Sequence, residues 1–427
     1  MWIGRTIIFS LFLAALWIGG WLFVRLSLSA DPIYYPEPRR SYWDYQVIDT
    51  MKYSRDLASE KLHDLDFDRV IDTQVERIAE TGATHVAIAT PYDEKFVPFL
   101  TRWVKAARSR GLKVWFRGNL SGWEGWFGYS KIGEREHIEK VRDFISHHPE
   151  LFQSGDLFTP CPECENGGSG DPRRTGNVEA FRRFLIESHQ SADAAFRSLG
   201  LLVDTRLFSM NGDVARLVFD AKTSIALGDV ITVDHYVKTP EKLEQDVRGF
   251  GKDGIRKVFL GEFGAPIPDI HGKMTATDQA AWLDQSLSRL ARVPNLIGVS
   301  YWLSVGGSTE LWNDKGEARP AVAILKKYFQ PNLRYGFVTD GLGKPIVGAT
   351  VSVGKYTTRT DSHGHFDLRY LDDGGDVITV EAPDFIAKVN QVGSSEQVRL
   401  RLEPVQPSAM YQFLQFVREQ FVSSTEI

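Results

Sequence analysis

Two glutamates, Glu163 and Glu262, are the residues of this 427-residue chain whose type and setting most directly indicate chemistry. Each lies close to the end of a short apolar run, DLFTPC from Asp156 and KVFLGEF from Lys257. Two carboxyl groups at one site can divide a hydrolysis between them, because one protonates the leaving oxygen while the other attacks the anomeric carbon or activates water. The pair therefore predicts cleavage of a glycosidic bond, with carboxyl groups about 5 to 5.5 Å apart if the mechanism is retaining.

The setting of Glu262 supports this interpretation. A carboxylate at the end of an apolar strand is costly to bury unless it has a purpose or a partner. Gly261 and Gly264 flank it, and we expect them to leave space beside the carboxylate for a bulky ligand such as a sugar ring. The alternative is a structural role, in which Glu262 forms an ion pair with an arginine of the same fold.

Other polar and aromatic residues also follow predicted strand ends and are candidates for substrate binding. Sugar rings stack on aromatic faces while their hydroxyl groups form hydrogen bonds. We expect the tryptophans to act as stacking platforms and the remaining residues to provide hydrogen bonds. The candidates are Arg117, Asn119, Trp123, Trp126, Asn166, Asn211, His235, Tyr236 and Trp302.

The stretch CPECENGGSGD contains Glu163 and also the two cysteines of the chain, Cys161 and Cys164. A redox motif would usually open a helix and expose its first thiol, whereas glycines follow here and acidic neighbours would raise the thiol pKa. A zinc site would need two further ligands that the sequence does not convincingly supply, so we predict no metal. We therefore interpret the stretch as a loop that carries the catalytic acid, and the cysteines are a disulfide candidate. Glu165 is a rival to Glu163 as the acid/base.

Residues 44–330 have the pattern of a parallel α/β fold, in which short apolar runs alternate with amphipathic helical segments. Eight such repeats fit a (β/α)₈ TIM barrel, whose functional residues lie at the carboxyl ends of the strands. An open dinucleotide-binding sheet is less consistent with the chain, because no glycine follows the first run. The runs begin at Tyr45, His85, Lys113, Asp156, Arg206, Val230, Lys257 and Leu296.

The residue composition changes after Pro331. Short segments rich in valine, threonine and glycine, separated by turn signals, predict an all-β sandwich over residues 331–404. The stretch GFVTDGLGKPIVGATVSVGKYTTRTDSHGHFDL resembles the carboxypeptidase regulatory-like domain, which implies a structural or surface-binding accessory without chemistry. Residues 405–427 carry apolar side chains at helical spacing, so we expect an amphipathic helix that docks on a domain or lies on a membrane surface.

The N-terminus contains the strongest targeting signal. Thr6 to Val24 carry no charge over nineteen residues, which is long enough for a helix to cross a bilayer. We predict a transmembrane anchor or signal segment in residues 1–30 and a linker in residues 31–43. The enzyme domain would then lie outside the cytoplasm, and it would be secreted if the segment were cleaved. The net charge of −5 argues against nucleic acid as a partner.

The barrel region also resembles a known group of enzymes. Glutamate on the fourth strand, His-Tyr on the sixth, Gly-Glu-Phe on the seventh and tryptophan on the eighth resemble the clan A glycoside hydrolases, which are retaining enzymes on a (β/α)₈ barrel. The resemblance covers residues 45–330 and implies a poly- or oligosaccharide substrate and no cofactor. It also implies that Glu163 is the acid/base, Glu262 the nucleophile, Tyr236 a partner of the nucleophile, and Trp302 the floor beneath the sugar.

One departure from the family pattern leaves alternatives open. The family's fourth strand usually ends in Asn-Glu-Pro, whereas this chain has Pro162-Glu163-Cys164. The contact of that asparagine with the sugar 2-hydroxyl must be lost or be made by Asn119, Asn166 or Asn211. A non-catalytic carbohydrate-binding or envelope-scaffold protein is therefore a second hypothesis, and an anchored thiol oxidoreductase is a third.

Overall fold

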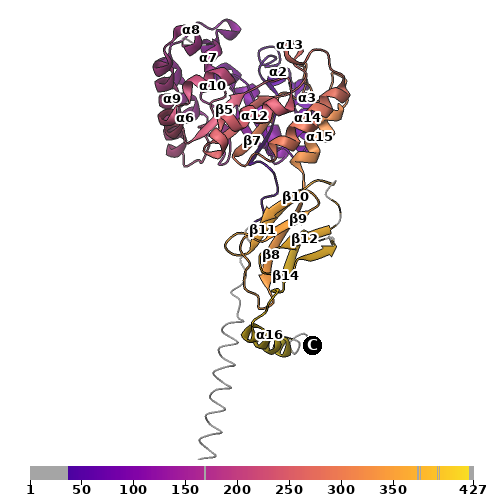
Figure 1. The fold of residues 1–427 in the computed structure, drawn as a ribbon. Coiled ribbons are helices and arrows are strands. Elements are labelled where there is room, and N and C mark those ends of the chain that lie inside the picture. Colours follow the sequence, from indigo (N-terminus) through magenta and orange to yellow (C-terminus); the bar gives the residue numbers. More distant parts are fainter. Residues whose placement is uncertain are drawn as a thin grey trace, which may run out of the picture. The chain divides into compact units, whose positions relative to one another are not determined.

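The computed structural model describes residues 37–422, except for 168, 169, 373, 374, 376, 392 and 394. The predicted anchor, Thr6 to Val24, and residues 31–36 of the predicted linker lie outside the described residues. Within the described residues no helix is long and apolar enough to cross a membrane. The described chain forms two compact units, one from Arg40 to Asn332 and one that contains the residues from Leu333 onward (Figure 1).

The first unit is built on a curled parallel sheet of seven strands with the order β4-β3-β2-β1-β7-β6-β5. Most of the strand residues are buried, which explains why the strands appear in the sequence as nearly continuous apolar runs. The strands are β1 (Tyr45–Asp49), β2 (His85–Ile88), β3 (Lys113–Phe116), β4 (Leu157–Phe158), β5 (Val230–Asp234), β6 (Lys257–Phe263) and β7 (Leu296–Tyr301).

The prediction of eight regular strands was wrong at the fifth run, RLFSMN from Arg206. Residues 204–211 form isolated parallel bridges instead, from Asp204 to β4 and from Asn211 to β5. The Asp204 carboxylate accepts the backbone N–H of Arg206 at 3.0 Å, and a local bond of this kind competes with a regular ladder. The segment nevertheless joins the two edge strands of the sheet, because the N–H of Phe158 bonds to Asp204 and that of Asp234 bonds to Met210.

Buried side chains from six of the strands and from the bridging segment fill the inside of the curled sheet. They are Val47, Ala87, Trp115, Leu157, Leu207, Val230 and Phe259. Helices separate successive strands along the chain, and their apolar faces are buried. In α3, for example, Ile71, Val75 and Ile78 lie at helical spacing and are all buried.

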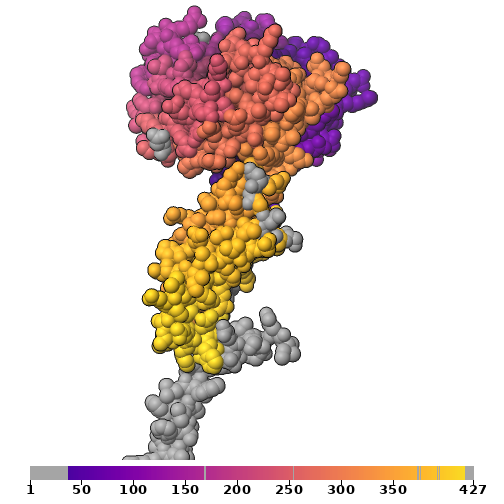
Figure 2. Space-filling model, turned by 45° about the vertical axis from the view of Figure 1, so that its right-hand side comes forward, coloured from indigo at the N-terminus to yellow at the C-terminus, as the bar shows by residue number. Residues whose placement is uncertain are grey.

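The long helices of this unit are α3 (Asp68–Glu80), α4 (Val97–Ser109), α6 (Glu134–His147), α9 (Val178–Ser198), α12 (Pro240–Phe250), α14 (Ala276–Leu290) and α15 (Pro320–Phe329). Its short helices are α2 (Met51–Ser54), α5 (Ser121–Glu124), α7 (Cys164–Gly167), α8 (Pro172–Thr175), α10 (Gly212–Val218), α11 (Ala221–Ala226) and α13 (Pro268–His271). Figure 2 shows the surface that these helices and their loops present, coloured from indigo to orange.

The second unit is a β-sandwich with one sheet in the order β10-β9-β12-β13 and the other in the order β11-β8-β14. Its separate core includes Val338, Val351, Phe366, Ile378 and Leu400, which come from both sheets. The strands are β8 (Asn332–Asp340), β9 (Thr350–Val353), β10 (Tyr356–Arg359), β11 (His365–Tyr370), β12 (Val377–Glu381), β13 (Lys388–Gln391) and β14 (Gln397–Leu402).

A C-terminal helix, α16 (Ala409–Val422), follows the sandwich. It is attached through polar contacts, because the Tyr411 hydroxyl accepts the N–H of Gly341 at 2.7 Å and Arg418 donates to the Gly341 carbonyl at 2.9 Å. Met410, Phe413 and Phe416 are 66%, 60% and 60% exposed. The contacts to the sandwich therefore involve the polar side of this helix, whereas three large apolar side chains face solvent.

Candidate active site

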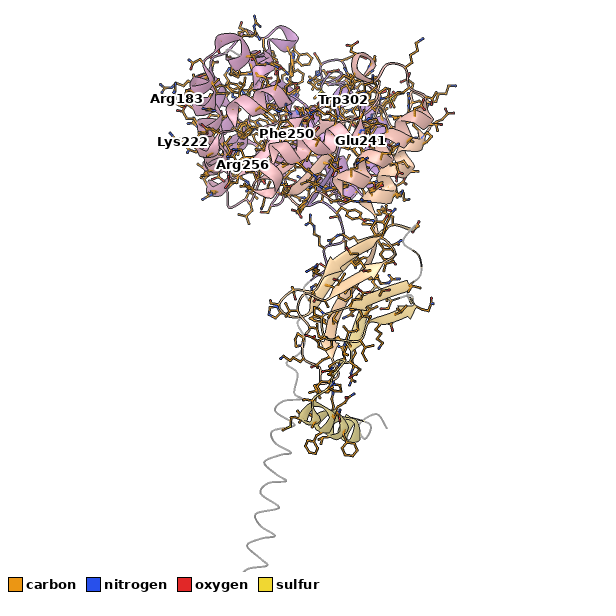
Figure 3. The ribbon with its side chains drawn as sticks, in the orientation of Figure 1. Arg183, Lys222, Glu241, Phe250, Arg256 and Trp302 are labelled. Atoms are coloured by element: carbon orange, nitrogen blue, oxygen red, sulfur yellow. A yellow bond between two sulfur atoms is a disulfide. The ribbon has the colours of Figure 1, made fainter. Side chains whose placement is uncertain are left out.

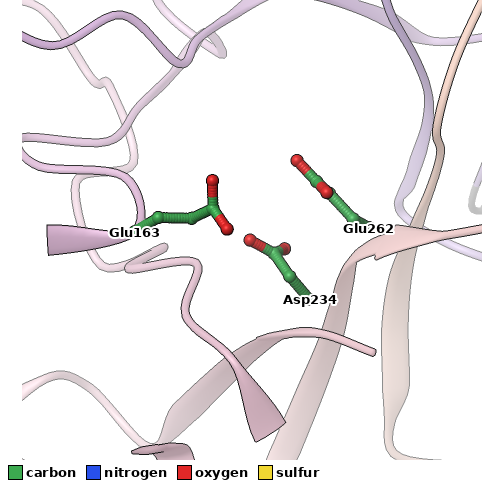
Figure 4. A group of neighbouring side chains, drawn as sticks. All are labelled: Glu163, Asp234 and Glu262. Carbon is green, nitrogen blue, oxygen red and sulfur yellow. The ribbon is translucent and has the colours of Figure 1, made fainter. Parts of the chain in front are cut away.

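Three carboxyl groups converge at the carboxyl ends of the strands in the first unit. Glu163 follows β4, Asp234 is the last residue of β5 and Glu262 lies near the end of β6. One carboxylate oxygen from each residue lies within 4.8 Å of those of the other two. Figure 4 shows the Glu163 and Glu262 side chains approaching from opposite sides, with the Asp234 carboxyl between them.

A buried arginine organises the floor of this site. Arg117 follows β3 and has no exposed side-chain surface. Its Nη1 donates to Asp49 at 2.8 Å and to Glu262 at 2.7 Å, while its Nη2 donates to Ser209 at 3.0 Å and to Asp234 at 3.2 Å. The predicted role of Arg117 in binding substrate was therefore wrong, because the Nη donors are bonded to protein groups and no side-chain surface remains.

Glu262 has a donor on each carboxylate oxygen. Arg117 binds Oε1, and the Tyr236 hydroxyl donates to Oε2 at 2.7 Å. The ion pair with Arg117 alone would suit a structural glutamate. Glu262 differs from such a residue because its second oxygen accepts the Tyr236 hydroxyl and because the Glu163 carboxyl lies close to it. Two donors stabilise the ionised form, which is the form that a carboxylate nucleophile requires.

Trp302 lies next to Tyr236, and the two ring centroids are 6.0 Å apart with the rings at 77°. It follows β7 and is partly exposed, so a face of the indole can reach a ligand. Figure 3 labels Trp302 near the top of the first unit and Arg256, which precedes β6, near the bottom. The carboxyl ends of the strands thus lie on the upper side in this view.

Glu163 occupies an unusual backbone conformation. Its φ is +46°, in the left-handed region that non-glycine residues seldom adopt, at a cost of about 1–3 kcal/mol. The conformation is held by the backbone bond from Glu163 N to Ser209 O at 2.9 Å and by Asn166, whose Nδ2 donates to Oε1 at 3.0 Å. Burial, and then the negative charge of Glu262, raise the pKa of Glu163 to about 8. At neutral pH the carboxyl is therefore protonated, as a general acid must be.

A disulfide joins Cys161 and Cys164 and encloses Glu163 in its short loop. Both cysteines are buried, and their neighbours fix the loop: Asn119 donates to Cys161 Sγ at 3.8 Å and Trp123 Nε1 donates to the Cys164 carbonyl at 3.3 Å. An exchange-active motif would expose its first sulfur. The burial of both sulfurs therefore does not favour the thiol oxidoreductase hypothesis.

Glu165, the rival acid, lies outside the group of three. Its Oε1 accepts from Asn211 N at 2.8 Å and from Asn211 Nδ2 at 3.1 Å. Its Oε2 has no hydrogen-bond partner among the described residues, and burial raises its pKa. The geometry thus favours Glu163 over Glu165 as the partner of Glu262.

Several residues predicted to bind substrate have other contacts. Trp123 is only 1% exposed and stacks on Phe184 at 4.9 Å, so the prediction that it is a platform was wrong. Trp126 is covered on one face by the guanidinium of Arg55 at 4.8 Å. His235 pairs with Asp246 on α12 at 2.9 Å, and its contact with substrate stays a prediction.

The asparagines that were candidates for a sugar contact divide into two groups. Asn119 is buried, and its amide bonds to Glu124 and His137, which leaves it little capacity to bind a ligand. Asn166 is exposed and contacts both Glu163 and Asn211. A polar contact beside the acid is therefore available from Asn166 and Asn211.

The glycines beside Glu262 do not open space for a ligand, contrary to our expectation. A Cβ at Gly261 would lie 2.5 Å from Asp234 Oδ1, and one at Gly264 would lie 2.6 Å from the Trp302 carbonyl oxygen. The glycines are required because neighbouring strands bring these protein atoms too close for any side chain.

Sequence reasoning missed Asp49 and Asp234. Each is the last residue of its strand, β1 and β5, so the rule that selected other strand-end residues also applied to them. Alternation along an extended chain points Asp234 and Tyr236 to the same side and His235 to the other. That signal was present in the run VITVDHY.

A separate cavity of about 810 Å³ lies at the opposite end of the strands. Its lining includes Tyr45, His85 and Lys113, the first residues of β1, β2 and β3, together with His189 and Arg206. The converging carboxyl groups are not part of it.

Comparison with known proteins agrees with this architecture. Residues 335–403 match the model of the carboxypeptidase regulatory-like domain family. No curated relative matches the chain. A GH5_18 protein from Streptomyces cattleya, solved in complex with GlcNAc, has a TM-score of 0.52 at 17% identity and covers 71% of this chain and 85% of its own.

A variant of the same Streptomyces cattleya protein was solved in complex with Manb1-4GlcNAc. It also has a TM-score of 0.52 at 17% identity, and the alignment covers 69% of this chain and 84% of that chain. At this identity the likeness shows a shared fold. The chemistry of the present site therefore has to be argued from its own residues.

Proposed function

We propose that the unit from Arg40 to Asn332 is a retaining glycoside hydrolase that acts on a poly- or oligosaccharide. Glu163 is the acid/base and Glu262 the nucleophile. The observation that carries the proposal is the approach of their carboxylate oxygens to within 4.8 Å. Retaining enzymes place their two carboxyl groups about 5 to 5.5 Å apart, whereas inverting enzymes leave about 6.5 to 9.5 Å for a water molecule.

The protonation states support the same assignment. Glu262 has the buried cation Arg117 on one oxygen and the Tyr236 hydroxyl on the other, which favours the carboxylate. Glu163 lacks an ion-pair partner among the described residues, and its pKa is raised to about 8 by burial and by Glu262. Two carboxyl groups with different protonation states are what acid and nucleophile require.

In the first step, the carboxylate of Glu262 attacks the anomeric carbon and the glycosidic C–O bond breaks. The Glu163 proton passes to the departing oxygen, so the leaving group departs as a neutral alcohol. In the second step, Glu163 takes a proton from water, the oxygen of that water attacks the anomeric carbon, and Glu262 is released as a carboxylate. Trp302, partly exposed beside Tyr236, supplies an apolar surface for the sugar ring.

The experiment is turnover of a panel of aryl glycosides by the wild type and by Glu262→Gln. We expect the variant to lose at least about 10⁴-fold in kcat, the scale of loss seen when a covalent nucleophile is removed. Nuclear magnetic resonance of the first product should show retention of the anomeric configuration. An activated glycoside that is hydrolysed slowly should label the peptide that contains Glu262.

Glu76→Gln is the matched control, because Glu76 is a half-exposed glutamate on α3 that pairs with Arg110 on the outside of the unit. It should keep wild-type kcat. If Glu262→Gln turned over substrate as fast as this control, the assignment of the nucleophile would be wrong.

A non-catalytic carbohydrate-binding protein is the second candidate. It is favoured by Pro162, which stands where the resemblance leads us to expect asparagine. This candidate predicts saturable binding of an oligosaccharide by the wild type with no turnover of any member of the panel. Calorimetric titration on the same samples separates the two functions.

We also propose that the chain is anchored in a membrane through Thr6 to Val24, with both described units outside the cytoplasm. The uncharged segment is long enough for a bilayer. A disulfide at Cys161 and Cys164 supports the location, because such bonds persist in oxidising compartments.

A further inference from the structure

Asp234 is a third carboxyl group at the site, and the two-glutamate mechanism gives it no role. It is 4% exposed and lies between Glu163 and Glu262 (Figure 4). Its Oδ2 accepts from Arg117 Nη2 at 3.2 Å. Its Oδ1 is buried and has no hydrogen-bond partner among the described residues.

The site holds more carboxyl groups than its cation can neutralise. Asp49 from β1, Asp234 from β5 and Glu262 from β6 all contact the guanidinium of Arg117, and Glu163 is within 4.8 Å of the last two. If all four carboxyl groups were ionised, three negative charges would remain uncompensated in a buried space. Carboxylates this close in a buried site cannot all ionise, so protons must be retained.

Other groups around Asp234 do not remove this excess. Glu165 adds a further carboxyl from the loop after β4, and Tyr236 and Ser209 are neutral hydroxyl groups. Arg55, the other cation that acts on Glu163, forms an ion pair with Asp56 at 2.8 Å, which offsets its charge. Which carboxyl groups keep a proton is therefore decided by which of them accept the fewest and longest hydrogen bonds.

The hydrogen bonds identify Asp234 as a proton carrier. Both oxygens of Asp49 accept a bond, from Arg117 and from the N–H of Met51, and both oxygens of Glu262 also accept one. Asp234 has the longest contact with Arg117 and an oxygen without a partner. Each donor that a buried carboxylate accepts stabilises its ionised form. Among the described residues Asp234 accepts one long bond, so the neutral carboxylic acid is the less costly form of this residue.

We propose that Asp234 is a positioning residue that remains a neutral carboxylic acid throughout turnover, so that Glu163 can hold its proton beside an ionised Glu262. The inference rests on the proposed function. With Asp234 neutral, the cluster of Arg117, Asp49, Asp234, Glu163 and Glu262 carries one net negative charge before the first step. Glu163 becomes negative as Glu262 forms its neutral ester, so the charge does not change during glycosyl transfer.

The pKa of Asp234 moves in the direction that this balance requires, and burial also raises the pKa of Asp49. Burial, and then Glu262, raise the pKa of Asp234 well above its ordinary value, and Glu163 raises it further. Glu262 and Glu165 in turn raise the pKa of Glu163.

The test compares two isosteric variants, Asp234→Asn and Glu165→Gln, on the same substrate. Asp234→Asn replaces a neutral group by a neutral group, so the alkaline limb of kcat/KM should stay at its wild-type pH while kcat falls. Glu165 accepts two N–H bonds from Asn211, which favour its ionised form. Glu165→Gln therefore removes a nearby negative charge, and its alkaline limb should move to lower pH by roughly one unit. Asp234→Ala should lose more activity than Asp234→Asn, because only the amide retains an acceptor for Arg117.

Infrared spectroscopy of the full chain provides a readout that does not depend on turnover. Glu163→Gln removes one protonated carboxyl, and the spectrum of this variant at pH 7 should still contain the carbonyl stretch of a buried carboxylic acid. The double variant Glu163→Gln with Asp234→Asn should lack that band. If the chain had no glycosidase activity but the Glu163→Gln spectrum contained this band, the proposed function would be rejected. The inference that Asp234 is protonated would still stand.

Three results would overturn the inference. One is an alkaline limb that moves in Asp234→Asn as far as in Glu165→Gln, and another is a Glu163→Gln spectrum without the carboxylic acid band. Calorimetric titration with Mg²⁺ adds a third, because a cation bound by the three carboxyl groups would require Asp234 to be ionised. Binding of Mg²⁺ that Asp234→Asn abolishes would therefore also contradict the proposal.

Discussion

Glu163 combines the features that an acid catalyst needs, and each has a separate physical source. Its left-handed backbone directs the side chain to the other carboxyl groups, and burial keeps its proton in place. Asn166 holds one oxygen of the carboxyl. The residue is therefore strained, partly buried and polar at once, a combination that occurs where function overrides local preference.

The pH dependence of the reaction follows from the raised pKa of Glu163. Only the protonated form donates to the leaving oxygen, so kcat/KM should fall as the pH rises through about 8. Glu163→Gln should lose about 10²–10⁴-fold on substrates with poor leaving groups, the usual contribution of general acid catalysis. Substrates whose leaving group needs no proton should be affected far less in the glycosylation step.

The measurement is a pair of pH–rate profiles, one for each leaving group. The alkaline limb should be present for the wild type with the poor leaving group and absent for Glu163→Gln. Glu165→Gln serves as the control that keeps the limb, displaced toward lower pH. An alkaline limb that survives in Glu163→Gln and disappears in Glu165→Gln would assign the acid to Glu165.

Strand-end chemistry could be predicted from the sequence, but side-chain environment could not. Glu163, Glu262, Tyr236 and Trp302 lie together because parallel strands deliver their carboxyl ends to one edge. Trp123 also follows a strand end, yet it is buried on Phe184. The difference depends on contacts with helices far away in the chain, and a local pattern of residues does not encode those contacts.

The loop after β4 is the element on which the proposed mechanism depends most. Its disulfide encloses Pro162 and Glu163, and Lys131 binds it from another loop by donating to the Gly167 carbonyl at 2.6 Å. The sequence favoured a loop over a helix after the cysteines, whereas the structure has a short helix, α7, from Cys164 to Gly167. This single turn begins directly at the second cysteine.

The double variant Cys161→Ser with Cys164→Ser should lose activity more than stability. Closing so short a loop stabilises a fold by less than about 3 kcal/mol, the value for a 15-residue loop. A displacement of the acid by about 1 Å can cost about 10²-fold in rate. We therefore expect a large fall in kcat with a small fall in the temperature of thermal unfolding, measured on the same preparation.

Reduction of the wild type provides the matched comparison. A reductant should lower kcat toward that of the double variant, and reoxidation should restore it. If the double variant kept full activity, the bridge would have no part in holding Glu163.

Regular strands were easier to predict than the segment that connects the edges of the sheet. Seven of the eight apolar runs contain strands, whereas the run from Arg206 does not form one. Asp204 lies just before this run. Its carboxylate accepts hydrogen bonds from the backbone N–H and from the guanidinium of Arg206, and these bonds replace regular strand pairing. An apolar run predicts burial well, but regular hydrogen bonding also requires that its polar neighbours do not compete.

The division of the chain into two units follows from composition. The barrel-like unit and the sandwich have separate cores, and the change in turn content after Pro331 marks the boundary between them. The match of residues 335–403 to a known domain family agrees with this division. The sequence could predict the class of each unit because the periodicities of helices and strands differ.

At the scale of the molecule, the proposed location is testable in cells that produce the protein. The chain should remain with membranes after a high-salt wash, and protease added outside intact cells should digest the units from Arg40 onward. A variant without residues 1–30 should be released from the membrane fraction. Recovery of the full chain in the cytosol, with Cys161 and Cys164 as free thiols, would contradict the proposal.

The cavity at the amino-terminal ends of the strands has a consequence for inhibitor discovery. It is lined by the first residues of β1, β2 and β3, whereas the carboxyl groups follow the other ends of the strands. A small molecule that filled it would not occupy the proposed carbohydrate site, so raising the concentration of the proposed substrate would not displace it. Screens that score only competition with a glycoside would overlook every compound of this kind.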